Sequence, residues 1–365
     1  MSRPPLPKLA AIATAVPPHV VRQNDARGLV AQLFSGQLAG NRRLLDVFEN
    51  AHIEQRHVCA PLEWFAEDHS FAEKNARYVD YAVRLASEAV TKALQRAHLV
   101  PSDVDHIVFV SSTGLATPSI DALLANALGF RADIRRTPIW GLGCAGGAAG
   151  ISHTRDLCLA RPTARVVLVA LELCSLTFQR GDLSKRNLVA SSLFGDGAAA
   201  AVVLGGATAG AEPNGRPGLE LVASRSVLWR DTVDVMGWTV DGDGLHVVFS
   251  RDIPTIVRER VRPSLTAFLD SCGVGLDVLE HVVAHPGGAK VLNAYAETLG
   301  LGEGALAHAR EVLRCYGNMS SPSCLFVLER FLDTGTIRPG DRALIAALGP
   351  GFSAEYVLTR AVGSD

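Results

Sequence analysis

Cys144 has the surroundings expected of a nucleophile. It follows a short, mostly apolar run and a glycine, and it precedes small residues that begin a predicted helix. A thiol at a helix N-terminus faces unpaired backbone N–H groups and the positive end of the helix dipole, which both favour the thiolate. The glycines and alanines at 143 and 145–149 predict open space around the sulfur. The alternative is a buried structural cysteine, since free cysteines are usually buried.

Two further residues are candidates to act with this thiol. His285 ends an apolar run at 281–285 that is typical of a buried strand, and ligands bind at the carboxyl ends of strands in open α/β sheets. Asn318 precedes a predicted helix at 322–332. An imidazole and an amide beside a thiolate can stabilise an oxyanion. Taken singly, His285 could equally be a hydrogen-bonded core histidine, and Asn318 a capping or turn residue.

Composition excludes several functional classes. The chain has 365 residues, 48% hydrophobic and 20% charged, which suits a globular protein of two domains. A net charge of −2 with scattered basic residues argues against nucleic-acid binding. The apolar stretch near the N-terminus is short and contains prolines, so we expect no signal peptide or membrane span, and a cytoplasmic location. Seven cysteines without a C-x-x-C pair, and eleven histidines without ligand spacing, argue against disulfides and a metal site.

The two halves of the sequence repeat one order of elements. The first half predicts a helix at 81–97, a strand at 105–111, the helix after Cys144, and strands at 164–171 and 198–204. The second half predicts a helix at 254–269, a strand at 281–285, a helix at 322–332, and strands at 342–348 and 353–360. The Gly- and Pro-rich segment 205–218 separates them, so we predict domains at 1–210 and 211–365. A duplication predicts a pseudo-twofold axis, across which Cys144 and Asn318 would meet.

Five stretches resemble the type III polyketide synthases, the chalcone and stilbene synthase group of the thiolase-like superfamily. They are residues 143–147 (G-C-A-G-G), 193–199 (L-F-G-D-G-A-A), 284–288 (A-H-P-G-G), 316–321 (Y-G-N-M-S-S) and 349–352 (G-P-G-F), in family order along most of the chain. The resemblance implies an α/β, thiolase-like fold with a duplicated five-layer αβαβα architecture and mixed sheets. It also implies a homodimer.

The resemblance implies a role for each residue of the set. Cys144 would be acylated by an acyl-CoA, and His285 and Asn318 would hydrogen-bond the thioester carbonyl of malonyl-CoA. Stabilising the enolate left by decarboxylation in this way is worth ~3 kcal/mol per donor. The enolate would then attack the Cys144 thioester. Acyl-CoA and malonyl-CoA would be the only small molecules required, with no metal and no cofactor.

The resemblance also bears on the substrate. Phe194 matches the family's gatekeeper aromatic, and Val247 aligns with a second gatekeeper, where its smaller side chain predicts a wider cavity mouth. The segment 172–179 is closer to bacterial members that make alkylresorcinols and alkylpyrones from fatty acyl starters than to plant chalcone synthases, and residues 148–150 predict room for a tunnel. A fatty starter and an alkylpyrone or alkylresorcinol product are therefore expected. The other predicted substrate-binding residues are Ser112, Thr117, Thr177, Ser320, Gly349, Pro350, Gly351 and Arg56, of which Arg56 lies in the family's basic coenzyme A segment and Thr117 is expected to reach the partner's cavity.

Three alternatives compete with this interpretation. A β-ketoacyl-carrier-protein synthase III shares the Cys, His, Asn set and performs a single condensation. A papain-like protease also orders its residues Cys, His, Asn, but its signature C-G-[SA]-C-[WY] near the mature N-terminus is missing around Cys144. A catalytically inactive homologue is disfavoured by the complete set of three residues.

Overall fold

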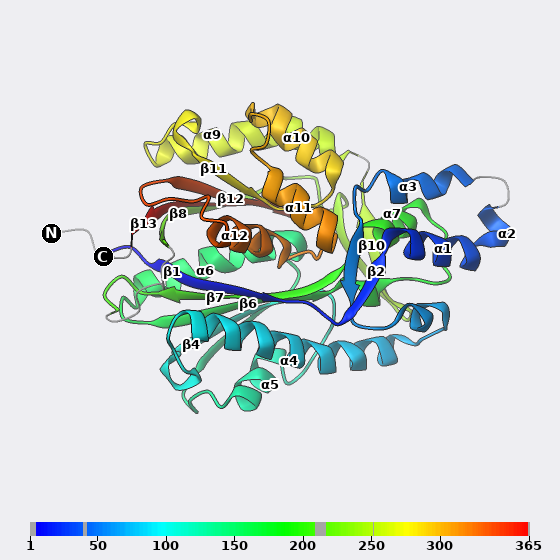
Figure 1. Ribbon diagram of the computed structural model, residues 1–365, viewed down its shortest axis with the longest axis horizontal. Helices are drawn as coiled ribbons and strands as arrows, with labels where there is room; N and C mark the ends of the chain where they lie inside the picture. The colour runs from blue at the N-terminus through cyan, green and yellow to red at the C-terminus, as the bar shows by residue number, and fades with distance from the viewer. Residues whose placement is uncertain (1–4, 39–41, 209–216, 251, 364–365) are drawn as a thin grey trace.

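The chain folds into five alternating layers of helices and strands (Figure 1). The computed structural model describes residues 5–38, 42–208, 217–250 and 252–363. Helices α4 (Phe71–Arg96) and α5 (Ile120–Leu128) form one outer layer, α9 (Arg262–Ser271) and α10 (Ala289–Leu299) the other, and α6 (Gly146–Ala160) and α12 (Ser323–Asp333) the central one. The five-layer prediction is confirmed. The domain boundary predicted at residue 210 lies outside the described residues.

Strand order repeats between the halves. The first half contributes β5 (Arg135–Ile139), β4 (His106–Val110), β6 (Arg165–Leu173), β7 (Asp196–Leu204) and β1 (Lys8–Ala15), and the second half contributes β11 (His281–Ala284), β12 (Arg342–Gly349), β13 (Ser353–Val362) and β8 (Gly218–Leu228). In each set a parallel pair, β4–β6 or β11–β12, is followed by two antiparallel pairings. Strands β1 and β8 pair through two residue pairs only, which link both sets into one nine-stranded order. The predicted duplication is therefore visible in the topology.

The central strands are apolar throughout because helices cover both of their faces. Every residue of β7 is buried, and its run of alanines from Ala198 to Ala201 lets the covering helices approach closely. The core accordingly forms two large clusters, one beneath α4 and one that includes the central helices and the second-half strands.

Helix α6 approaches its neighbours closely because it carries little side-chain volume. A Cβ on Gly147 would lie 2.2 Å from the carbonyl oxygen of Ser321, and one on Gly150 would lie 2.5 Å from Leu168 Cδ1. Ala148 and Ala149, between these glycines, are buried as well. The small residues after Cys144 thus serve close packing, and the prediction that residues 148–150 leave room for a tunnel is wrong.

Helix α4 begins at Phe71, earlier than the predicted start near residue 81. Ser70 and Glu73 form a capping box at its N-terminus. The Glu73 backbone N–H donates to Ser70 Oγ at 3.3 Å, and the Ser70 N–H donates to Glu73 Oε2 at 2.8 Å. These two bonds satisfy backbone donors that would otherwise be unpaired in the first turn.

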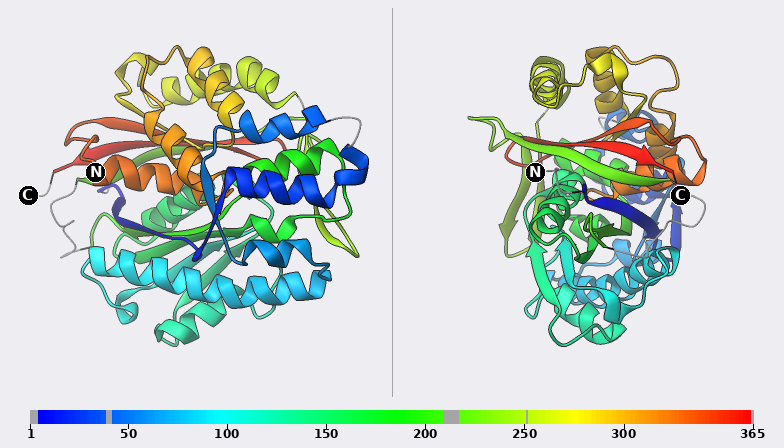
Figure 2. Two further views of the ribbon diagram at one scale, coloured as in Figure 1. Left: turned by 45° about the vertical axis from the view of Figure 1, so that its right-hand side comes forward. Right: turned by 90° about the vertical axis from the view of Figure 1, so that its left-hand side faces the viewer.

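Shorter elements lie at the end of the layers opposite the chain termini (Figures 1 and 2). They are β2 (His19–Arg22), α1 (Gln23–Leu33), α2 (Ser35–Leu38), α3 (Asp46–Glu49), β3 (Gln55–Val58), α7 (Lys185–Leu193) and the hairpin of β9 (Met236–Asp241) and β10 (Gly244–Phe249), while α8 (Ile253–Ile256) and α11 (Ala307–Tyr316) complete the second half. None of the helices in the described ranges combines the length and apolarity that a membrane span needs.

Candidate active site

Cys144 lies in a turn of 3-10 helix, Gly143–Ala145, directly ahead of α6. Ser112 holds this turn from one side, because its Oγ accepts the backbone N–H groups of Gly141 at 3.2 Å and Gly143 at 3.1 Å. Pro350 packs from another side, where a Cβ on Gly143 would lie 2.9 Å from Pro350 Cδ. Cys144 itself is buried, with 7% of its surface exposed.

The loop from Gly349 to Phe352 supports the same turn. A Cβ on Gly349 would lie 2.5 Å from the Ala145 Cβ, so the close approach requires glycine. Gly351 has φ +126°, which also favours glycine. The hydroxyl of Ser353 donates to the Pro350 carbonyl at 3.0 Å and fixes the loop. In this geometry Gly349, Pro350 and Gly351 position the backbone at Cys144.

Asn318 directs its amide nitrogen toward the thiol. Its Nδ2 lies 4.0 Å from Cys144 Sγ and donates to the Gly287 carbonyl at 3.2 Å. The Ser320 backbone N–H donates to Asn318 Oδ1 at 2.8 Å, which orients the amide with its nitrogen toward the sulfur. Gly287 also contacts the third residue, since a Cβ there would lie 3.5 Å from His285 Nε2. The structure thus brings Cys144, His285 and Asn318 into one site.

His285 is a buried histidine with free ring nitrogens. It follows β11, and its backbone N–H donates to the Ala346 carbonyl at 2.8 Å. Neither Nδ1 nor Nε2 has a hydrogen-bond partner among the described residues. Burial lowers the pKa of His285 to about 3, so the ring is neutral at pH 7. One N–H and one lone pair are therefore available to a substrate.

The thiol of Cys144 is also neutral. Burial raises its pKa to about 11, although hydrogen bonding by Ser320 and Asn318 lowers it, and the nearby carboxyl of Glu172 adds to the increase. The expectation that the helix N-terminus favours the thiolate is therefore wrong, because the cost of desolvating a charged sulfur is the larger effect. A reaction in which this sulfur acts as a nucleophile requires a base.

Glu172 is a buried carboxyl beside the site to which the sequence alone assigns no role. Its Oε2 accepts the Ser112 backbone N–H at 2.9 Å and the Thr113 hydroxyl at 2.7 Å, and its Oε1 accepts the Ser321 hydroxyl at 3.0 Å. Burial raises its pKa to about 7. The carboxyl therefore ties the turns of the two halves together behind Cys144. A glutamate within the apolar run of β6 is the sequence signal for it.

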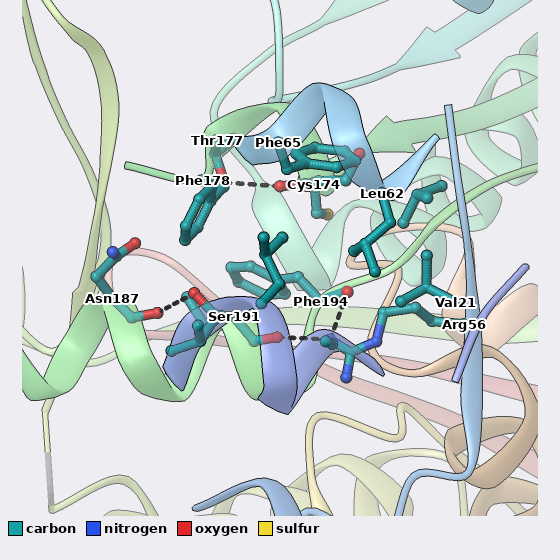
Figure 3. Close-up of a pocket in the computed structure, with 16 residues that line it drawn as sticks. Val21, Arg56, Leu62, Phe65, Cys174, Thr177, Phe178, Asn187, Ser191 and Phe194 are labelled. Carbon is teal, nitrogen blue, oxygen red and sulfur yellow. Dashed lines mark hydrogen bonds between the residues drawn. The ribbon is translucent and has the colours of Figure 1, made fainter. Parts of the chain in front are cut away.

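A cavity of about 80 Å³ lies beside Phe194 (Figure 3). Its lining is mainly apolar and comes from β2, α1, β3, α7 and neighbouring segments: Val21, Ala26, Leu29, Val30, Val58, Leu62, Phe65, Phe178 and Ala190. The predicted residues Thr177, Phe194 and Arg56 also line it. Cys144, His285 and Asn318 are not in the lining, but the Asn318 backbone N–H donates to the Leu193 carbonyl at 2.8 Å and its carbonyl accepts the Gly195 N–H at 3.1 Å. Phe194 therefore stands between the cavity and the three residues.

Two aromatic rings, those of Trp238 and Phe249, gather at Phe194. The ring centroid of Trp238 lies 6.0 Å from that of Phe194, and Phe249 lies 5.7 Å from it. Val247 packs in the same cluster and is the cross-strand neighbour of Trp238 in the β9–β10 hairpin. The small side chain of Val247 predicts a wider cavity mouth, but Trp238 occupies part of that space. Only the register of the hairpin reveals this pairing.

Arg56, a predicted substrate-binding residue, lies inside the protein and lines the cavity beside Phe194. Only 3% of its surface is exposed. Its guanidinium donates to the carbonyls of Ser191 at 2.7 Å, Ser192 at 3.1 Å and Phe194 at 3.1 Å, and to the side chain of Gln23. A cation at these carbonyls stabilises the C-terminal end of α7. This geometry does not support a contact with coenzyme A phosphates.

Thr117 is exposed on the loop before α5 and lines neither of the cavities found in the described residues.

One group of side chains in the described residues could hold a metal ion. It consists of Asp241, Asp243 and His246, in and next to the turn of the β9–β10 hairpin. Asp241 and Asp243 are exposed, and His246 Nε2 lies 3.0 Å from Asp241 Oδ1. We assign no metal to this group.

Comparison with known proteins gives a consistent result for both halves. The N-terminal domain of chalcone and stilbene synthases matches residues 6–208, and the C-terminal domain matches residues 220–363. The chain is 42% identical to a 1,3,6,8-tetrahydroxynaphthalene synthase of Streptomyces peucetius subsp. caesius, over 96% of this chain and 92% of that protein. It is 40% identical to a putative chalcone synthase of Bacillus subtilis (strain 168), over 96% and 97%. The crystal structure of 1,3,6,8-tetrahydroxynaphthalene synthase from Streptomyces coelicolor A3(2) superposes with a TM-score of 0.91 at 32% identity, over 98% and 99%.

Proposed function

Because the chain belongs to the chalcone and stilbene synthase family, the type III polyketide synthases, we propose that it extends an aliphatic acyl-CoA starter repeatedly with malonyl-CoA. The product is an alkylpyrone or an alkylresorcinol. Enzymes of this family are acyltransferases that join coenzyme A thioesters by decarboxylative condensation and need no further cofactor. The observation that carries the assignment of the site is the buried His285 ring with both nitrogens unpaired, beside the Asn318 amide and the Cys144 thiol.

In the loading step, Cys144 becomes the acyl carrier. Its sulfur attacks the thioester carbonyl of the acyl-CoA, and its proton passes to the free lone pair of the neutral His285 ring. The bond from the acyl carbon to the coenzyme A sulfur then breaks, and the leaving thiolate takes this proton. A neutral thiol beside a neutral imidazole suits this sequence, because the free enzyme holds no buried charge at these two residues, and the charges that form during the attack are neutralised when the coenzyme A thiolate takes the proton.

In the extension step, His285 and Asn318 act on malonyl-CoA. A ring N–H of His285 and the Nδ2–H of Asn318 donate to the thioester oxygen. The carboxylate leaves as CO2, its electron pair forms the enolate, and the enolate carbon attacks the acyl carbon on Cys144. The Cys144 sulfur is released, and the chain is two carbons longer. Each donor is expected to contribute ~3 kcal/mol to stabilising the enolate oxygen.

The cavity beside Phe194 supports an aliphatic starter. Its walls are mostly alkyl and aromatic side chains from α1, β3 and α7. Phe194, which lines it, lies between Leu193 and Gly195, whose backbones form hydrogen bonds with the backbone of Asn318. Each methylene that enters such a cavity contributes ~0.8 kcal/mol. We assign Phe194, Val247, Thr177 and Ser320 to the walls that an acyl chain would contact.

The similarity to tetrahydroxynaphthalene synthases favours a second candidate product, 1,3,6,8-tetrahydroxynaphthalene. That product has no alkyl tail, so it would leave the apolar cavity unused. Mass spectrometry after incubation with malonyl-CoA, alone or with a panel of acyl-CoAs, separates the two. Incorporation of the aliphatic starters supports our assignment, and tetrahydroxynaphthalene from malonyl-CoA alone, without starter incorporation, supports the second candidate.

We also propose that the protein is a homodimer joined near β5. Strand β5 is an edge of the nine-stranded order, and Leu115 and Trp140 beside it are 44% and 50% exposed. The indole of Trp140 donates to the Gly114 carbonyl at 3.2 Å, so these two apolar side chains flank one loop. Exposed Thr117 lies on the same loop, where it could enter the cavity of a second subunit. Light scattering tests the dimer, which a purely monomeric protein would contradict.

A further inference from the structure

The β9–β10 hairpin forms a separate two-stranded sheet, outside the nine-stranded order. It carries Trp238 and Val247, which pack against Phe194. A two-stranded hairpin is at best marginally stable on its own in water. The placement of these side chains therefore depends on what attaches the hairpin to the rest of the protein.

Gln179 contributes hydrogen bonds from its side-chain amide to that attachment, in addition to the packing of Trp238, Val247 and Phe249 against Phe194. Its Nε2 donates to the carbonyls of Leu245 at 3.1 Å and Asp243 at 3.4 Å. Within the described part of the chain, no other residue from outside the hairpin forms a hydrogen bond with β9, β10 or the turn between them. The turn also fits closely against α4, since a Cβ on Gly244 would lie 3.1 Å from the Phe71 ring.

The orientation of the Gln179 amide is itself fixed. Lys74 Nζ donates to its Oε1 at 3.3 Å and to the Phe178 carbonyl at 3.2 Å, so the amide nitrogen must face the hairpin. Asn187 holds the backbone by donating from Nδ2 to the Gln179 carbonyl at 2.7 Å. Gln179 is 7% exposed, so water does not readily replace these bonds.

We propose that Gln179 is a positioning residue that holds the hairpin against Phe194 and so determines which starters and chain lengths the site accepts. Gln179 lines neither cavity and acts only through the backbone of the hairpin. The inference rests on the proposed function, in which Phe194 and Val247 form walls that the acyl chain contacts. It adds a residue whose effect on selectivity does not require contact with the acyl chain.

Gln179→Glu tests the inference, because a carboxylate can still accept from Lys74 but cannot donate to the two hairpin carbonyls. Gln95→Glu, at an exposed position on α4, is the matched control. For Gln179→Glu we expect the KM for the acyl starter, or the ratio of long to short products, to change about fivefold, as loss of one or two hydrogen bonds implies. Decarboxylation of malonyl-CoA, which depends on His285 and Asn318, should stay within about twofold of wild type on the same reasoning.

The product ratio is measured on every chain length that the wild type makes, including any made from malonyl-CoA alone. Wild type that never incorporates an acyl starter contradicts the proposed starter, whereas unchanged starter KM and product ratio in folded Gln179→Glu contradict the positioning role. If Gln179→Glu also loses decarboxylation of malonyl-CoA, the positioning role is contradicted as well, because the substitution would then disturb the whole active site and not only starter selection. Gln179→Met, similar in length but unable to form either bond, replaces the glutamate variant if that one does not fold.

Discussion

The amide nitrogen of Asn318 lies 4.0 Å from the sulfur of Cys144, although 174 residues separate them in the sequence. Each residue precedes a helix of the central layer, Cys144 before α6 and Asn318 before α12 (Figure 1). Equivalent helix N-termini of the two halves therefore meet, as the duplication predicts. The site exists only because the halves fold against one another.

Variants of the three residues should separate the two steps. Cys144→Ala should abolish condensation and leave decarboxylation of malonyl-CoA, because the sulfur carries the acyl group and does not contact the malonyl thioester oxygen in our assignment. His285→Ala and Asn318→Ala should each slow decarboxylation by about 10²-fold, as loss of one oxyanion donor does. CO2 release and product formation measure the two steps. Full product formation by any of the three variants would contradict the assignment.

Alkylation of Cys144 should depend steeply on pH. With a pKa of about 11, the folded protein holds the thiol protonated at pH 7, and the thiolate fraction grows as the pH rises toward that value. The rate of iodoacetamide modification should therefore rise about tenfold per pH unit between about pH 7 and 9. Mass spectrometry of the Cys144 peptide distinguishes it from the half-buried Cys272 and Cys315. A rate that levels off below about pH 8 would show an ion pair with His285 instead.

The sequence predicts the architecture, and the meeting of Cys144 with Asn318, for physical reasons. Strands covered on both faces require continuous apolar runs such as β6 and β7, and the duplicated order can be read directly from them. Gly147 and Gly150, by contrast, suggest from the sequence an open space near the thiol. In the structure they let α6 pack directly against Ser321 and Leu168. A glycine shows only that a side chain is missing, and tertiary packing decides what fills its place.

The protonation state of Cys144 and the surroundings of Arg56 and Trp238 could not be predicted from the sequence. A helix N-terminus predicts a thiolate, but burial of Cys144 outweighs that effect. Arg56 suggests a phosphate contact by its place in the chain, whereas its side chain stabilises the end of α7 from within. Trp238 becomes a neighbour of Phe194 only through the cross-strand register with Val247. Burial and register both depend on long-range packing.

Val247→Phe should restrict the chain lengths that the site accepts. The added ring enters the cluster of Phe194, Trp238 and Phe249 and takes space from the acyl chain. We expect the ratio of long to short products to fall roughly tenfold, as for a pocket that loses a few methylenes. Val248→Phe is the matched control, because neighbouring strand residues face opposite sides. Equal product ratios for the two variants would contradict a role of Val247 in the cavity.

Ala26→Leu should discriminate against long starters. Ala26 lies on α1 and lines the apolar cavity, whereas Ala31 lies on the same helix and does not. The larger side chain removes room for about three methylenes, so the KM for long acyl-CoAs should rise about tenfold or more while short starters change little. Ala31→Leu should behave as wild type. If both variants treat long starters alike, the cavity does not hold the acyl tail.

The most direct test of the proposed function is the product made from purified protein, a panel of aliphatic acyl-CoAs and isotope-labelled malonyl-CoA, without any carrier protein. We predict cyclised products that contain one intact starter and at least two labelled two-carbon units, as an iterative polyketide synthase forms. A β-ketoacyl product with a single labelled unit, formed only when a carrier protein is added, would contradict the account.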